Sequence, residues 1–95
     1  MEIESIRHKA LRAFAETGRS KGLPTDVVGR IRNMLTYLSA VERPAELFVP
    51  PNYGAHPLTG NRVGEWSLSL TRNWRMTYRV NDHGAIEDLD LEDYH

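Results

Sequence analysis

The residues most able to do chemistry in this chain lie in three separate places. The chain ends on Asp93, Tyr94 and His95, which bring together an acid, a phenol and an imidazole. His56 stands in an irregular stretch near the middle, and Arg75 lies in an alternating stretch further on. Histidine can accept or donate a proton near neutral pH, whereas arginine stays charged and can stabilise an anion. These residue types suit metal-independent cutting of RNA, in which a 2′-hydroxyl attacks the adjacent phosphate.

Plainer interpretations of the same residues remain open. A polar chain end is usually frayed, and a single histidine such as His56 usually lies on the surface. His8 and His83 are expected to be structural, at a helix start and in a turn. The terminal carboxylates could bind a metal, but no histidine pair at i, i+4 accompanies them. We therefore expect neither a metal nor a cofactor.

Length and composition indicate one soluble domain over residues 1–95. The apolar share is 40% and the charged share 26%, and there is no cysteine. The absence of cysteine excludes disulfides and thiolate chemistry and suits the cytoplasm. No signal peptide or membrane-length apolar run is visible, so we expect a cytoplasmic protein without a membrane partner.

Charge is distributed unevenly along the chain. Residues 58–81 carry four arginines against one glutamate, whereas residues 82–95 carry six acidic residues and no lysine or arginine. The net charge of −1 gives no general sign of nucleic-acid binding. The arginine-rich middle can still form a local anion site, because the field depends on local arrangement. A solvated strand face is the alternative.

The order of predicted elements indicates an α+β fold. Residues 2–7 suit a short strand, and residues 8–18 and 24–40 show the apolar spacing of helices. Residues 43–61 are expected to be mostly loop. Strands follow over residues 65–70, 73–80 and 85–91, with a two-residue turn between the first two. We therefore expect a short N-terminal strand and a two-helix hairpin packed on a mainly antiparallel sheet.

The alternation within residues 73–80 predicts two different strand faces. Its apolar set must meet the helices, which places Asn73, Arg75 and Arg79 on the opposite, polar face. That face, beside the loop with His56 and the terminus with His95, is where we expect chemistry.

Several motifs together resemble a known family. The loop "HPLTG", the strand "GEWS", the strand "NWRMT" and the terminal "DYH" occur here in one order and spacing. They resemble the HigB toxins of the RelE/ParE superfamily, and the likeness spans nearly the whole chain. The resemblance implies a RelE-like fold. One departure is Thr59, which stands where the family usually has lysine; either Arg62 supplies that charge or RNA binding is weaker.

The resemblance also implies a function and a set of site residues. It implies a bacterial toxin that cleaves mRNA, usually in the A site of the 70S ribosome. It implies a HigA-like helix-turn-helix antitoxin, through which alone the toxin would meet operator DNA. The catalytic set is His56 and His95 for proton transfer, Arg75 for the phosphate, Asp93 to orient a histidine and Tyr94 to hold the substrate. The RNA-binding set is Thr59, Arg62, Arg72, Asn73 and Arg79.

Two rival functions stay open at this point. A toxin of the same fold can act by binding a protein such as DNA gyrase, as the ParE branch does. His56 together with the terminal "DYH" argues against that branch, which does not depend on the histidine-bearing terminus. The second rival is a module that binds only antitoxin and operator DNA, for which His95 and Arg75 would be dispensable.

Overall fold

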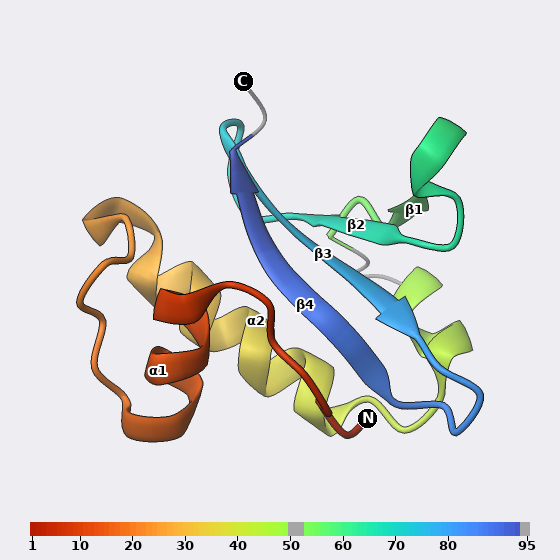
Figure 1. Cartoon of the computed structure of the whole chain (residues 1–95), viewed down its shortest axis with the longest axis horizontal. Coiled ribbons are helices and arrows are strands. Elements are labelled where there is room, and N and C mark those ends of the chain that lie inside the picture. The colour runs from red at the N-terminus through yellow and green to blue at the C-terminus, as the bar shows by residue number, and fades with distance from the viewer. Residues whose placement is uncertain (50–52, 94–95) are drawn as a thin grey trace.

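Within residues 1–49 and 53–93, which the structure describes, two α-helices cover one face of a four-stranded antiparallel sheet (Figure 1). This computed structural model confirms the predicted α+β architecture. The strands follow chain order across the sheet, and each is hydrogen-bonded to its neighbour in sequence. The strands are β1 (His56–Pro57), β2 (Trp66–Ser69), β3 (Trp74–Val80) and β4 (Ile86–Asp93).

Helix α1 (Lys9–Thr17) begins and ends where its caps require. The side chain of His8 accepts a hydrogen bond from the backbone N–H of Leu11 at 3.1 Å, which satisfies one of the open donors of the first turn. Gly18 ends the helix with φ 78°, a left-handed conformation that glycine adopts without strain. The prediction that His8 is structural is therefore confirmed.

Helix α2 (Val28–Ala40) starts later than the sequence suggests. The expected first turn is a 3₁₀ turn, η1 (Thr25–Val27), and Pro24 caps that turn rather than opening the α-helix. The apolar stripe is nevertheless as predicted, because its residues reach the common core. The buried members on this stretch are Val27, Ile31, Met34 and Leu38.

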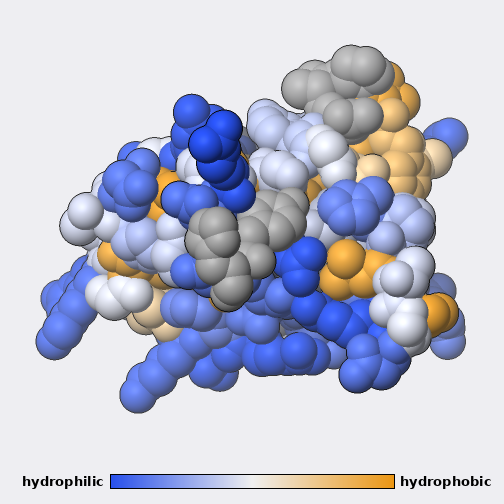
Figure 2. All heavy atoms as spheres, turned by 90° about the horizontal axis from the view of Figure 1, so that it is seen from above, coloured by the Kyte–Doolittle hydropathy of each residue, from blue (hydrophilic) through white to orange (hydrophobic). Residues whose placement is uncertain are grey.

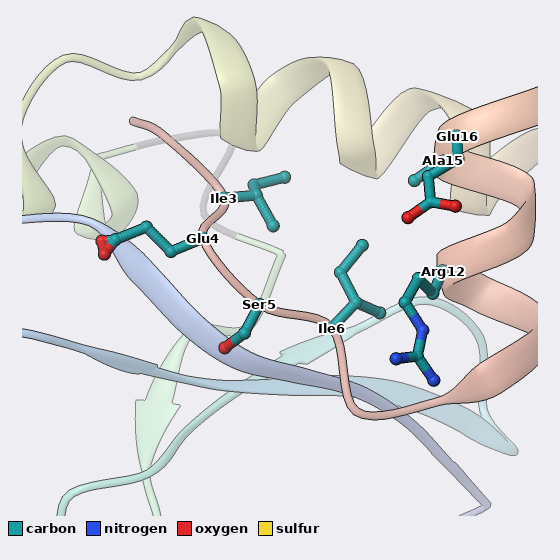
Figure 3. Close-up of a pocket in the computed structure, with 7 residues that line it drawn as sticks. All are labelled: Ile3, Glu4, Ser5, Ile6, Arg12, Ala15 and Glu16. Atoms are coloured by element: carbon teal, nitrogen blue, oxygen red, sulfur yellow. The ribbon is translucent and has the colours of Figure 1, made fainter.

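The N-terminal segment, which was expected to be a short strand, pairs with the sheet only at isolated positions. It lies beside β4 through two isolated parallel bridges, which join Ile3 to Ile86 and Ile6 to Leu89. The bridged residues are three apart in both segments, and Asp88, which lies between the two bridged residues of β4, has φ 54°. Ile3 and Ile6 still point toward the helices and line a pocket between this segment and α1 (Figure 3).

The same irregularity explains why residues 85–91 looked poorly patterned. The register between β3 and β4 shifts between Thr77 and Arg79, opposite Asp88. One extra residue in a strand moves the following side chains to the other face. The buried residues of β4 therefore follow an interval of three and then of two: Ile86, Leu89 and Leu91.

The hairpin between β2 and β3 is confirmed, but its turn is longer than two residues. β2 ends at Ser69 and β3 begins at Trp74. The hydroxyl of Thr71 accepts hydrogen bonds from the backbone N–H groups of Asn73 and Trp74, both at 3.2 Å. This side-chain turn explains how the chain reverses without the glycine that short hairpins favour.

The stretch expected to be mostly loop contains short elements that position the site. It holds two 3₁₀ turns, η2 (Pro44–Phe48) and η3 (Gly60–Arg62), with β1 between them. No helix within the described ranges is long and apolar enough to cross a membrane. The face of the molecule seen from above is mainly hydrophilic among the described residues, with apolar atoms gathered in smaller areas (Figure 2).

Candidate active site

The polar face of the sheet, opposite the helices, carries the charged residues that the alternation predicted. Met76 and Tyr78 of β3 are buried in the core, so Arg75 and Thr77 point the other way. Arg75 is half-buried, whereas Thr77 and the neighbouring Ser67 of β2 are fully buried in spite of being polar. Charged side chains therefore cover this face.

Arg62 is held between two carboxylates. Its Nε and Nη2 donate to the two oxygens of Glu65 at 2.9 and 3.0 Å. Its Nη1 donates to Oε1 of Glu92 at 2.8 Å, and its Nη2 also donates to Oε2 of Glu92. Every nitrogen of this guanidinium thus bonds to a carboxylate, and the pKa of Arg62 is raised, mainly by the hydrogen bonds to Glu92. The positive charge of Arg62 is therefore balanced by Glu65 and Glu92 rather than available to an external anion.

Glu92 also bonds to two residues of β3. Arg75 Nη2 donates to Oε1 of Glu92 at 3.0 Å, and the Thr77 hydroxyl donates to Oε2 at 2.6 Å. The hydrogen bonds from Arg62 are the main reason that the pKa of Glu92 is lowered to about 2, and burial acts in the opposite direction. Glu92 is therefore a carboxylate at neutral pH.

Acid should destabilise the fold through this carboxylate. A group whose pKa is lower in the folded chain than in the unfolded chain stabilises the fold above its unfolded pKa, and that contribution disappears as pH falls. The pKa of Glu92 falls from its ordinary value of 4.5 to about 2 in the folded chain, so the free energy of unfolding should decline as pH falls from 4.5 to about 2. Urea titrations at several pH values in this window should show a shallower decline for Glu92→Gln. Equal slopes in the two proteins would contradict this role.

His56 lies at the other side of the same face. It is exposed on the edge strand β1, and it pairs with Ser67, which in turn pairs with Thr77. Its Nδ1 lies 2.8 Å from the carbonyl oxygen of Gly54. Because a carbonyl can only accept, Nδ1 must carry the proton, which leaves Nε2 of the neutral ring as an acceptor. His56 is thus oriented as a candidate base.

The remaining predicted residues fall into three places. Thr59 is exposed and precedes η3, in the same loop as Arg62. Arg72 and Asn73 are exposed in the turn between β2 and β3. Arg79 lies on the polar face, 3.9 Å from Glu65. Its guanidinium also lies so close to Gly64 that a Cβ there would be 2.7 Å from Nη1.

The terminal triplet is described only as far as its first residue. Asp93 ends β4 and pairs with Trp74, whereas Glu92 pairs with Arg75. Paired residues of an antiparallel ladder share a face, so Asp93 is not in the row of Arg75. Tyr94 and His95 lie outside the described residues. The structure therefore brings together Arg62, Arg75 and Arg79, places His56 on their face, and sets Asp93 at the end of the neighbouring strand.

Sequence reasoning missed the two glutamates that organise this face. Glu65 is only 7% exposed, although the sequence suggested no more than a lone acid among arginines. Glu92 lay within an acidic run and showed no sign of special burial. The alternation of Asp90, Leu91 and Glu92 was the available signal, since it places Glu92 opposite the apolar set. The partner of Glu92 in β3 could not be predicted, because it depends on the register between β3 and β4.

Comparison with known proteins identifies the family. A family model of HigB-like toxins, described as the RelE-like toxin of type II toxin-antitoxin system HigB, matches residues 4–95. This chain belongs to that family. A curated relative, the endoribonuclease HigB of Proteus vulgaris, is 37% identical over 94 residues, covering 98% of this chain and 99% of the relative. A HigB-like toxin of a type II system has an antitoxin as its protein partner.

Solved structures agree with the HigB-like fold. YafQ from Escherichia coli strain BL21(DE3) aligns with a TM-score of 0.62 at 14% identity, covering 98% of this chain and 92% of YafQ. A YoeB/ParE toxin from Agrobacterium tumefaciens aligns with a TM-score of 0.52 at 18% identity, covering 100% of this chain and 94% of that one. At these identities the likeness concerns the fold alone.

Proposed function

We propose that this HigB-family toxin, a single domain over residues 1–95, is a metal-independent endoribonuclease that cuts messenger RNA in the ribosomal A site. The observation that carries the proposal is the polar face of the sheet in this HigB-like chain. His56, oriented by the carbonyl of Gly54, and Arg75, held by Glu92, lie on that same face. The 37% sequence identity to an enzyme named endoribonuclease HigB, over nearly the full length of both chains, supports the activity.

The residues suggest a route for the reaction. A histidine, His56 or His95, accepts the proton of the 2′-hydroxyl, and the oxygen attacks the adjacent phosphorus. Arg75 stabilises the charge that develops on the phosphoryl oxygens. The bond from phosphorus to the 5′-oxygen then breaks, and the other histidine protonates that oxygen. The products are a 2′,3′-cyclic phosphate and a 5′-hydroxyl.

The remaining site residues have supporting roles in this proposal. Asp93 orients a histidine, and Tyr94 holds or stacks the substrate. The RNA contacts in this proposal come from the η3 loop, the hairpin turn and β3: Thr59, Arg72, Asn73 and Arg79. Arg62 is the exception among the proposed RNA contacts, because its guanidinium is already bound to Glu65 and Glu92.

The proposal extends to the partners of the toxin in the cell. A HigA-like antitoxin with a helix-turn-helix domain neutralises the toxin in the bacterial cytoplasm, and operator DNA is reached only through that antitoxin. The substrate is a message bound to the 70S ribosome. No cofactor takes part.

Cleavage mapping tests the proposal. Purified toxin is added to a defined message with and without translating ribosomes, beside a variant that lacks Tyr94 and His95. We expect cuts only with ribosomes, 5′-hydroxyl ends at the cuts, and loss of cutting in the truncated variant, because it lacks a proton donor or acceptor. A circular dichroism melt of both proteins serves as the control for folding.

Two outcomes would contradict parts of the proposal. Cuts on free RNA would remove the ribosome from the mechanism. An uncut message, with folded toxin that still arrests cell growth, would move the function to a protein target such as gyrase.

A further inference from the structure

The carboxylate of Glu92 joins three elements of the site. It extends from β4 and accepts hydrogen bonds from Arg62 of η3 and from Arg75 and Thr77 of β3. Oxygen Oε1 receives two of these bonds and Oε2 the other two. Since a carboxylate offers about four acceptor positions, its capacity is filled. A group bonded in this way has little freedom to move.

This arrangement restrains Arg75 in particular. Arg75 and Glu92 are directly opposite in the ladder, so the backbone sets the distance between their side chains. Arg62 and Thr77 hold the carboxylate from its other sides, so Arg75 meets an acceptor that is already fixed. A guanidinium held in advance loses less freedom when it meets a phosphate, and catalysis depends on such positioning.

The same carboxylate also weakens the field of the site. Three arginines, Arg62, Arg75 and Arg79, share the polar face with two glutamates, Glu65 and Glu92. Each glutamate cancels one positive charge that would otherwise attract RNA phosphates. Glu92 should therefore act in opposite directions on RNA binding and on the chemical step.

We propose that Glu92 is a positioning residue for RNA cleavage, which holds Arg75 in its reactive orientation at the cost of weaker RNA binding. This inference rests on the proposed endoribonuclease function. Glu92 does not touch the reacting atoms; it acts through Arg75. Arg62 shares this role, as the cation that holds the Glu92 carboxylate in place.

The test measures turnover and binding separately in Glu92→Gln. We expect kcat on ribosome-bound message to fall about 10- to 100-fold, because a small misplacement of a catalytic group has an effect of this order. We expect affinity for ribosomes carrying a message with a 2′-deoxy nucleotide at the cut site to be unchanged or higher, because one negative charge is lost. A purely structural role would lower thermal stability and leave kcat per folded molecule unchanged.

Two further variants sharpen the result. Glu92→Asp keeps the charge but shortens the side chain, so it should lower kcat while leaving affinity close to that of the wild type. Glu16→Gln makes the same change of charge on α1, which packs on the opposite face, and should behave as the wild type.

The outcomes separate this inference from the function on which it rests. If the wild type fails to cut ribosome-bound message, the proposed function fails and the inference fails with it. If the wild type cuts and both Glu92 variants, folded by circular dichroism, cut with the same kcat, the positioning role is overturned while the endoribonuclease stands. A parallel loss of affinity and turnover in Glu92→Asp would also overturn it.

Discussion

Replacing Arg75 with alanine is expected to lower the rate of RNA cleavage by about 100- to 1000-fold, the usual effect of removing one donor that stabilises a developing anion. Arg75 lies half-buried on the polar face, and its Nη2 is fixed by Glu92 at 3.0 Å. A fixed cation is most effective in the transition state, where negative charge is greatest. The loss should therefore appear mainly in kcat.

Folding should survive this substitution. Glu92 keeps its hydrogen bonds from Arg62 and Thr77 when Arg75 is removed, so no carboxylate is left buried without a partner. Single-turnover cleavage of ribosome-bound message measures the effect, with a circular dichroism melt to confirm folding.

Two comparison variants make the Arg75 result specific. Arg75→Lys keeps the charge but loses the planar fork, and should recover only part of the rate. Arg19→Ala removes one exposed positive charge from the loop after α1 and should leave the rate unchanged. Near wild-type cleavage by a folded Arg75→Ala protein would exclude Arg75 from the chemistry.

The largest effect on stability is expected from the centre of the sheet. Leu68 of β2 is completely buried and lies opposite Met76 of β3, in the core shared with the helices. Truncating a buried leucine to alanine removes about 2–5 kcal/mol from the free energy of unfolding, because transfer energy is lost and a cavity remains. In a domain of this size that is a drop in Tm on the order of 10–30 °C.

Matched variants separate burial from residue type. Leu68→Met keeps most of the volume, so its cost should stay below about 1.5 kcal/mol. Val63→Ala removes apolar atoms from a side chain that is 69% exposed, and should change stability by less than about 0.5 kcal/mol. Thermal and urea unfolding measure all three variants. A Leu68→Ala protein as stable as Val63→Ala would mean that the core is packed differently.

Local patterns in the chain were enough to predict the two helices, the strands β2 to β4 and the faces of the central strands. The helical spacing of apolar residues located α1 and α2, and the alternation in residues 65–80 predicted which side Arg75 would take. These patterns are reliable because side-chain direction follows from the backbone geometry of one segment. The motif order also pointed to the HigB-like family, which the family comparison confirms.

Contacts between segments far apart in the chain could not be predicted in this way. The pairing of Arg75 with Glu92 depends on the register of β3 against β4, and the irregularity at Asp88 shifts that register. A shift of one residue would have moved Glu92 to the other face. The hydrogen bond from His56 to Gly54 likewise requires the backbone path of a loop that no periodic pattern describes.

The sequence alone thus predicted the residue types of the candidate site, the two helices, the strands β2 to β4, and the face of the sheet on which Arg75 lies. The folded chain added the ties between these residues: Glu92 as the common acceptor, Arg62 as a bound cation, and the proton on Nδ1 of His56. Periodicity is a property of a few consecutive residues. Register, burial and hydrogen-bond partners arise only when distant segments pack together, and they set the orientation and charge of the side chains that we propose for catalysis.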